Sequence, residues 1–327
     1  MTLIILAETS ESFFTLDEKV RVIQLPLHFG ITPKGNMLTR KIKMFFDIRK
    51  LRKTLKKINP SLVIATEYPY TIASIIGKPS QQTKIVCWEH SHFSVNFKNK
   101  FWTNLFKLTY PKLNQIVCQS TDEKELYKTV NKNITVIPYF IDRSEYTAAL
   151  QNKIILTVAR LAPIKGIPHL LKAAKQVLNK HPDWKWKIIG EGELEKDVTD
   201  FIEKENLHNK LILQKPVNQN IHWEYQNSSL LVMTSINECF PMVLLEALSN
   251  GLPCIAFDCD TGPRHIITHN DDGLLVEKEN PMQLAKAISS LIQDEALRKN
   301  MGANAIRNIQ RFSRENVYQL WNTEVFN

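Results

Sequence analysis

Two successions of short apolar runs, separated by amphipathic helical stretches, constrain the fold of this chain more than any other feature. Strands that alternate with helices form parallel sheets covered by helices on both faces. The sequence therefore predicts an α/β protein with two doubly wound parallel sheets. The expected strands span residues 2–6, 20–25, 62–65, 84–88, 115–118 and 134–137 in the first half, and 154–159, 186–189, 211–213, 230–234, 253–257 and 273–276 in the second.

Helices are expected wherever apolar residues recur every three or four positions. Asn59-Pro60 ends the first of them, and Pro241 is expected to be the first helical residue of a later one. The expected helices span residues 38–58, 97–109, 122–130, 167–180, 193–206, 241–249, 281–292, 295–309 and 314–325.

The length of 327 residues suits two domains of roughly 150 residues each. Residues 143–152 are polar and irregular, which places the linker there. We expect a first domain over residues 1–148, a second over 149–310 and a C-terminal helix over 311–327. No apolar run approaches the roughly 20 residues that span a bilayer, and the first eight residues are too short for a signal peptide. A cytoplasmic protein is expected.

Five cysteines without a C-x-x-C pair argue against a disulfide framework and against a zinc site. We expect them to be small buried side chains. They are Cys87, Cys118, Cys239, Cys254 and Cys259.

Positive charge is concentrated in the first half, where residues 1–150 carry 22 Lys and Arg against 12 Asp and Glu. Its densest run, residues 40–58, has apolar positions 44, 45, 48, 51, 55 and 58 at helical spacing. This pattern leaves two interpretations open. The helix either packs one apolar stripe on the core, or also rests its basic face on anionic lipid. Nucleic acid would suit the charge, but no recognition motif is present.

In the second half, residues that could bind a ligand follow the ends of strands. Arg160 and Lys165 follow one strand and precede a helix, so two cations lie beside helix amides that favour a diphosphate. Gly190-Glu191-Gly192 follows the next strand as a tight turn.

A third segment with such residues begins just before the helix 241–249 and continues into it. Glu238 comes just before this helix and Glu246 lies within it. A glutamate on an apolar helix is costly to bury unpaired, but one facing a cleft can accept bonds from sugar hydroxyls. The first amides of the helix can hold phosphate or a hydroxyl. The segment is Asn237-Glu238-Cys239-Phe240-Pro241-Met242-Val243-Leu244-Leu245-Glu246.

In this order and spacing, these motifs resemble the retaining glycosyltransferases of family 4, which have the GT-B fold of two Rossmann-like domains facing a cleft. The resemblance covers the whole second half. It includes Gly251-Leu252-Pro253, Thr261-Gly262-Pro263 and Asp272-Gly273-Leu274-Leu275-Val276.

The resemblance implies a role for each matching residue. Arg160 and Lys165 would hold the donor diphosphate, Glu238 would bind the transferred sugar, and Glu246 would bind the ribose. The remaining donor-binding positions implied are Gly190, Glu191, Cys239, Phe240, Pro241, Met242, Val243 and Gly262. No metal or other cofactor is expected, because cations and helix amides replace it. Asp258-Cys259-Asp260 has the spacing of a metal motif but is interpreted as a strand end.

The first half resembles the family's acceptor domain more loosely. Trp88-Glu89-His90-Ser91-His92 follows a strand, and family members often carry a histidine there that faces the donor sugar. His90 is the candidate, and Glu89 and His92 are less favoured. Thr66-Glu67-Tyr68 forms another turn at a strand end. The C-terminal helix is expected to pack back over this domain.

The chain departs from the family at its start, since the usual first strand and Gly-rich loop are absent before Met1. About one βα unit is expected to be missing.

The sequences of the segments around Phe240 and Gly262 are similar to those of bacterial transferases of capsule, exopolysaccharide and O-antigen synthesis. It predicts a UDP-linked hexose or N-acetylhexosamine as donor and a glycan or lipid-linked acceptor, with a possible membrane contact through the basic helix. The alternatives are a truncated, inactive paralogue that still binds nucleotide sugar, and a sugar-nucleotide epimerase of the same fold.

Overall fold

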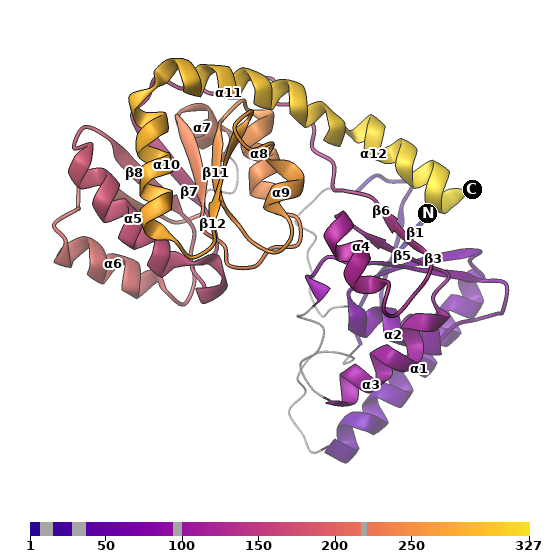
Figure 1. Cartoon of the computed structure of the whole chain (residues 1–327). Helices are drawn as coiled ribbons and strands as arrows, with labels where there is room; N and C mark the ends of the chain where they lie inside the picture. The colour runs from indigo at the N-terminus through magenta and orange to yellow at the C-terminus, as the bar shows by residue number, and fades with distance from the viewer. Residues whose placement is uncertain (7–15, 28–36, 94–99, 217–220) are drawn as a thin grey trace. The chain divides into compact units, whose positions relative to one another are not determined.

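The computed structural model describes residues 1–6, 16–27, 37–93, 100–216 and 221–327, with side chains described from residue 42 in the first helix (Figure 1). Contacts divide the chain into two compact units. Unit 1 comprises residues 1–118 and 124–136, and unit 2 comprises residues 119–123 and 137–327. The expected domain limits at residues 148 and 310 stay predictions.

Unit 1 contains two parallel sheets among its described residues. A pair, β1 and β2, runs beside a four-stranded sheet in the order β3-β4-β5-β6. The strands are β1 (Thr2–Ile5), β2 (Arg21–Gln24), β3 (Leu62–Thr66), β4 (Lys84–Trp88), β5 (Gln115–Cys118) and β6 (Ile134–Val136). The helices that connect them are α1 (Met37–Ile58), α2 (Tyr68–Ile76), α3 (Lys100–Thr109) and α4 (Thr121–Tyr127).

Unit 2 contains one six-stranded parallel sheet in the order β12-β11-β10-β7-β8-β9. Every pairing is parallel, so each connection must cross over one face of the sheet, as helices do. The strands are β7 (Ile154–Val158), β8 (Lys185–Ile189), β9 (Leu211–Gln214), β10 (Leu230–Met233), β11 (Cys254–Asp258) and β12 (Gly273–Glu277).

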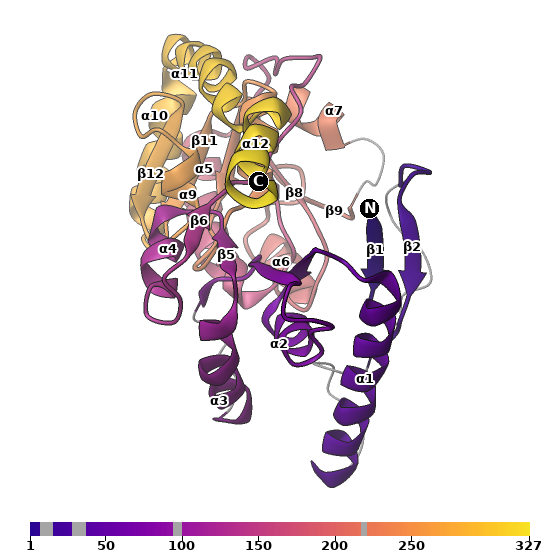
Figure 2. The ribbon, with the colours of Figure 1, turned by 90° about the vertical axis from the view of Figure 1, so that its right-hand side faces the viewer.

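Helices cover both faces of this sheet (Figures 1 and 2). The helices of unit 2 are α5 (Ile167–Lys180), α6 (Glu195–Lys204), α7 (Ile221–Gln226), α8 (Met242–Ser249), α9 (Pro263–Ile266), α10 (Pro281–Gln293), α11 (Glu295–Asn308) and α12 (Arg314–Trp321). The last of them, α12, extends beyond the sheet and contacts mainly the short helical segments Ile309–Phe312 and Asn322–Phe326 that flank it.

Successive residues of the central strands enter opposite cores, because side chains alternate along a strand. Ile155 packs in the core under α5, α6 and α10, whereas its neighbour Leu156 packs in the core under α8 and α11. Ile255 and Ala256 divide in the same way. The strands β7 and β10 are therefore almost entirely apolar, which is why they appear in the sequence as continuous runs rather than alternating patterns.

Two details of the sequence analysis are wrong. Phe45 does not belong to the core-facing stripe of α1, since its side chain is 60% exposed while Leu51 and Leu55 are buried. Pro241 is not helical: its backbone is extended, and α8 begins at Met242. The short helices α2, α7 and α9 were not predicted; they span nine, six and four residues.

None of the helices in the described residues is long and apolar enough to cross a membrane. The longest of them, α1, carries basic side chains along most of its length.

A buried indole ties three strands of unit 2 together. The Trp186 side chain is fully buried, and its Nε1 donates a hydrogen bond to the Thr157 hydroxyl at 3.0 Å. That hydroxyl donates to the carbonyl oxygen of Val232 at 2.9 Å. The bonds connect β8, β7 and β10, the strands at the centre of the sheet.

Replacing Trp186 by phenylalanine is expected to lower the free energy of unfolding by about 2–4 kcal/mol, because a donor is lost and a void is left. Trp223→Phe is the control, since Trp223 is 50% exposed and should change stability little. Denaturant unfolding of both variants measures the difference, and equal losses would contradict the prediction.

Candidate active site

The strand order of unit 2 reverses between β7 and β10. The chain proceeds from β7 to β8 and β9 on one side, and from β10 to β11 and β12 on the other. Helices that follow adjacent strands in opposite directions leave a space at the carboxyl ends of those strands, where doubly wound sheets bind ligands. The segments after β7 and β10 are therefore where the site is expected.

These two segments are held together by backbone contacts. Gly166 has a left-handed backbone (φ 64°), and a Cβ there would lie 2.0 Å from the carbonyl oxygen of Thr234. The Thr234 hydroxyl donates to the Lys165 carbonyl at 2.9 Å, and the Ile236 amide donates to the Ile164 carbonyl at 2.8 Å. Only glycine permits this approach. The position of Lys165 thus depends on Gly166.

The turn at Gly190 packs in the same way against the segment that contains Arg160. A Cβ at Gly190 would lie 1.9 Å from the carbonyl oxygen of Ala159. The Leu161 amide donates to the carbonyl of Glu191 at 2.8 Å. The glycine therefore has a packing reason that is independent of any ligand, and its predicted donor contact stays a prediction.

Lys165 and Glu238 form an ion pair, with Nζ and Oε1 separated by 2.5 Å. The side chains are 24% and 13% exposed, so water screens the pair only partly. The Thr261 hydroxyl donates to the carbonyl of Glu238, and Gly262 (φ 85°) lies against the Glu238 side chain. Three of the predicted residues, Lys165, Glu238 and Gly262, are thus brought together from the ends of β7, β10 and β11.

Arg160 lines an open depression of about 460 Å³ beside this cluster of loops. The other lining residues are Ala162, Pro163, Ile164 and Glu193. The volume falls within the range of small-molecule sites. Glu193 follows the G-x-G turn and was not predicted as a site residue, since a glutamate in a polar helix start carries no distinguishing pattern.

The start of α8 presents backbone amides to the same strand edge. No side chain caps this helix, so its first amides keep the partial positive charge of a helix N-terminus. Cys239 and Phe240 are buried, at 8% and 4% exposure, so their side chains belong to the core. Pro241 has no amide hydrogen. Of the predicted segment, the amides of Met242 and Val243 are the helical donors.

Glu246 lies on α8 and accepts a hydrogen bond from the Tyr225 hydroxyl at 2.6 Å. The Tyr225 pKa is raised well above its ordinary value by burial and by the nearby Glu246 carboxylate. The phenol therefore keeps its proton and orients the carboxylate. Glu246 itself is half-buried and retains a second oxygen for another partner.

The two carboxylates of Asp258-Cys259-Asp260 pair with separate cations. Arg264 Nε lies 2.9 Å from Asp258, and Lys278 Nζ lies 3.0 Å from Asp260. Cys259 stands between these two aspartates in the sequence. Burial and the charge of Glu238 raise the pKa of its thiol to about 12.

His90 belongs to unit 1, where it follows β4. Its ring packs on Trp88 with 4.5 Å between centroids, and burial lowers its pKa. Its neutral form is therefore favoured near neutral pH. Glu67 follows the adjacent strand β3 and has a positive φ of 61°, which is uncommon for a residue with a side chain.

Glu89, the buried acid next to His90, makes more interactions than its place in the sequence indicates. Glu89 is 1% exposed, and its Oε1 accepts hydrogen bonds from the Tyr110 hydroxyl and from the Cys87 thiol, the latter at 3.1 Å. Burial raises the pKa of Glu89. The three side chains anchor the turn that carries His90. Sequence could not reveal this arrangement, since Tyr110 is 21 residues away from Glu89.

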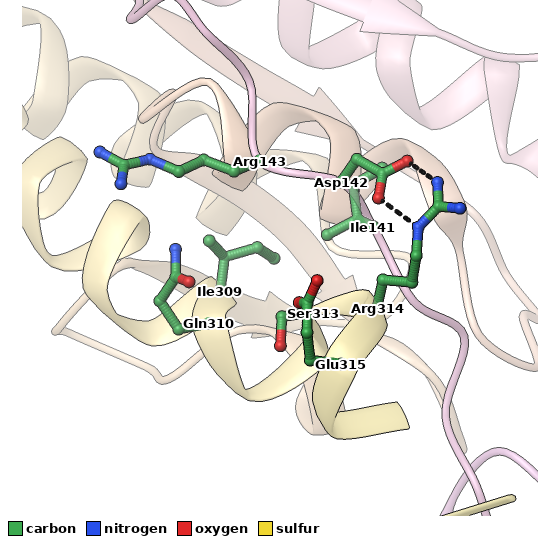
Figure 3. A pocket seen from close by; sticks show the side chains of 8 residues that line it. All are labelled: Ile141, Asp142, Arg143, Ile309, Gln310, Ser313, Arg314 and Glu315. Carbon is green, nitrogen blue, oxygen red and sulfur yellow. Dashed lines mark hydrogen bonds and ion pairs between the residues drawn. The ribbon is translucent and has the colours of Figure 1, made fainter. Parts of the chain in front are cut away.

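A second hollow, of about 150 Å³, is lined by other residues (Figure 3). Its lining includes the two-bonded ion pair between Arg314 and Asp142, with Arg314 Nε and Asp142 Oδ1 at 2.8 Å. The Ile141 amide donates to the Phe312 carbonyl at 2.9 Å. The hollow lies between the start of α12 and residues 141–143, the segment that enters unit 2. None of the predicted site residues lines it.

Comparison with known families identifies the chain. A model described as "Glycosyl transferases group 1" matches residues 140–308, which is more than half of the chain. A second, described as "Glycosyltransferase Family 4", matches residues 5–145. The chain belongs to the group 1 glycosyl transferases, and the expected resemblance to family 4 is confirmed.

Three curated relatives match along nearly the whole chain. An uncharacterized glycosyltransferase of Haemophilus influenzae is 28% identical over 95% of this chain and 87% of its own length. The amylovoran biosynthesis glycosyltransferase AmsD of Erwinia amylovora is 28% identical over 96% of this chain and 87% of its own length. An N-acetyl-D-galactosaminyltransferase of Campylobacter jejuni is 26% identical over 97% of this chain and 88% of its own length, and its name specifies an undecaprenol-linked saccharide.

Solved structures confirm the two-domain GT-B fold. Anabaena HepE in complex with UDP has a TM-score of 0.78 at 17% identity, over 93% of this chain and 85% of its own. Staphylococcus aureus TarM, in complex with fondaparinux, alpha-GlcNAc-glycerol and UDP, has a TM-score of 0.73 at 22% identity, over 85% of this chain. The chain covers 58% of the TarM chain, somewhat more than half its length.

Substituting alanine for Gly190 is expected to lower the free energy of unfolding by about 2–4 kcal/mol, because the new methyl group collides with the Ala159 carbonyl. The neighbouring Glu191→Ala variant is the control, since Glu191 is exposed. Thermal denaturation compares them. A Gly190→Ala variant as stable as the control would show that the contact is not restrictive.

Glu89→Gln is expected to flatten the dependence of stability on pH. Because the pKa of Glu89 is raised in the folded chain, its contribution to stability is full below the ordinary carboxyl pKa and is lost as pH rises through the folded-state pKa. The loss reaches at most about 1.4 kcal/mol per pH unit. Glutamine keeps an acceptor oxygen for Tyr110 but does not titrate.

Denaturant unfolding over a pH series, from below the ordinary carboxyl pKa to neutral pH, measures this effect. The control is Glu125→Gln, which removes an exposed carboxylate of the same unit. If Glu89→Gln and Glu125→Gln show the same pH dependence, Glu89 does not retain its proton.

Proposed function

We propose that this chain transfers a hexose or N-acetylhexosamine from a UDP-sugar to a glycan or lipid-linked acceptor in the synthesis of a bacterial cell-surface polysaccharide. The observation that carries the proposal is the arrangement at the reversal of strand order in unit 2. Arg160 and Lys165 follow β7, and Glu238 and the α8 amides follow β10, so the ends of two adjacent strands bring them to one edge of the sheet. The solved complexes with UDP and the named polysaccharide relative support the same donor class and pathway.

The donor diphosphate would bind against positive charge from side chains and backbone. Arg160 and Lys165 supply two cations, and the uncapped start of α8 supplies oriented amides. Together they stabilise the charge that develops on the leaving phosphate. Because these groups perform the usual task of a divalent ion, we propose transfer without a metal.

In the reaction, the bond from the anomeric carbon to the diphosphate oxygen breaks and a bond to the acceptor oxygen forms. The proton of the acceptor hydroxyl passes to the departing phosphate oxygen. We propose retention of anomeric configuration, with attack on the face that the phosphate leaves. No enzyme nucleophile is needed, so the role of the chain is positioning and charge stabilisation.

Glu238 has a second role in this scheme, since it is paired with Lys165. Binding of the diphosphate would give Lys165 a more highly charged partner, and the Glu238 carboxylate would then accept hydrogen bonds from the sugar hydroxyls. Those hydrogen bonds would replace the charge-assisted contact that the carboxylate loses. Glu246, oriented by Tyr225, would accept bonds from the ribose hydroxyls.

The acceptor would bind to unit 1, where His90 would contact one of its hydroxyl groups. The neutral imidazole favoured by its lowered pKa can exchange hydrogen bonds with hydroxyl groups without adding charge. The undecaprenol-linked saccharide in the name of the Campylobacter jejuni relative supports a lipid-linked acceptor. Such an acceptor would bring the chain to the inner face of a membrane.

Calorimetric titration with UDP in the presence of EDTA tests the donor site. Arg160→Ala and Lys165→Ala are each expected to weaken binding at least about tenfold, because each removes a charge-assisted contact to phosphate. Lys172→Ala, an exposed lysine of α5, is the control. Unchanged affinity in both site variants would refute the phosphate role, and binding abolished by EDTA would refute metal independence.

Glu238→Gln separates binding from transfer. Loss of the ion pair frees Lys165, so UDP affinity is expected to be maintained or increased. Consumption of UDP-sugar is expected to fall about 100-fold, as when a single group that stabilises a transition state is removed. The two quantities are measured by calorimetry and by chromatography of released UDP. A parallel loss of both would place Glu238 among simple binding residues.

A further inference from the structure

The outward face of α1 departs from the usual surface of a helix in a water-soluble protein. Its inner face is well packed, with Leu51 and Leu55 at 2% and 3% exposure. On the opposite side, Ile42, Phe45 and Phe46 are 49%, 60% and 62% exposed. Three neighbouring large apolar side chains in water are unfavourable, and such patches usually mark interaction surfaces.

A basic surface continues from this apolar group along the same helix. From Arg49 onward, the exposed positions are occupied almost entirely by cations, and the one acidic residue of α1, Asp47, is 7% exposed. The exposed cations are Arg49, Lys50, Arg52, Lys53, Lys56 and Lys57. Residues 42, 46, 49 and 53 follow helical spacing, so the apolar and basic parts share one face.

The start of α3 carries a further exposed aromatic side chain. The helices α1 and α3 both pack on α2, and their N-terminal ends point to the same end of unit 1 (Figures 1 and 2). Phe101, the second residue of α3, is 42% exposed, and it follows the exposed Lys100. A second helix of unit 1 therefore adds an exposed aromatic residue next to a cation.

We propose that this face of unit 1 docks on an anionic lipid surface. Phe45, Phe46 and Phe101 enter the headgroup region, and the cations of α1 pair with lipid phosphates. Aromatic rings are favoured at the boundary between headgroups and acyl chains, and lysine and arginine bind anionic headgroups. The inference goes beyond sugar transfer, because lipid binding requires neither donor nor acceptor.

The distribution of the side chains favours lipid over single-stranded nucleic acid. Proteins that bind nucleic acid strands interleave aromatic rings with cations along a groove, so that bases stack successively. On α1 the exposed apolar side chains Ile42, Phe45 and Phe46 are instead gathered within five residues that include Lys43, and the exposed cations of residues 49–57 follow them. That grouping suits insertion of the three apolar side chains between headgroups while the cations that follow lie along the charged surface.

Sedimentation of the full chain with vesicles tests the proposal. We expect binding to phosphatidylcholine vesicles that contain phosphatidylglycerol, and little binding to phosphatidylcholine alone. Phe45→Ser/Phe46→Ser is expected to lower the partition coefficient at least about tenfold. Arg49→Gln/Lys53→Gln is expected to lower it about tenfold or more and to reduce its dependence on salt.

Matched controls carry the same changes elsewhere. Tyr318→Ser removes an aromatic residue of α12 that is 60% exposed, and Lys172→Gln/Lys180→Gln removes two exposed cations of α5. Both are expected to bind vesicles as the unmodified chain does. Binding of a single-stranded oligonucleotide, but not of anionic vesicles, would overturn the proposal, as would α1 variants that bind vesicles normally.

UDP titration of the same proteins separates this inference from the proposed function. The α1 variants are expected to bind UDP with unchanged affinity, which also shows that they are folded. An unmodified chain that binds vesicles but not UDP would refute the donor site and leave the lipid surface intact. The reverse result would refute only the lipid surface.

Discussion

The contact between the segments after β7 and β10 is the constraint on which the candidate donor site depends. Gly166 brings its backbone against the carbonyl of Thr234, closer than any Cβ would permit. This approach places Lys165 beside Glu238, a residue 73 positions further along the chain. The site is therefore a consequence of backbone packing at the reversal of strand order. The paired charges are the visible result of that packing.

The Lys165–Glu238 pair also balances charge within the candidate donor site. A partly buried lysine without a counter-charge would be destabilising, and Glu238 supplies the compensation. Glu246 has a different kind of internal partner, since the neutral Tyr225 hydroxyl orients one of its oxygens. Each carboxylate proposed to contact the donor is therefore positioned by another side chain of the same unit.

Unit 1 depends on a different kind of interaction. Its candidate histidine is held by a buried acid, a phenol and a thiol, whose mutual hydrogen bonds leave no exposed charge beneath the turn. At its surface, by contrast, unit 1 exposes cations and aromatic rings that find no partner in the core. One unit thus combines a neutral, preorganised turn with a strongly charged exterior, which is consistent with an acceptor that carries both hydroxyl groups and a charged anchor.

The sequence alone determined the alternation of strands and helices, the two units with parallel sheets, and the segments after β7 and β10 in which Arg160, Lys165, Glu238 and Glu246 occur. These features are local: burial on both faces makes a strand apolar throughout, and a helix shows its packed side within a few turns. Tertiary structure alone decided that β7 lies beside β10, that Glu89 is bonded to Tyr110, and that Phe45 is exposed. Each of these depends on which distant segment packs against the residue. An apolar side chain carries the same local signal whether it enters a core or faces another surface, so only the fold could distinguish the two.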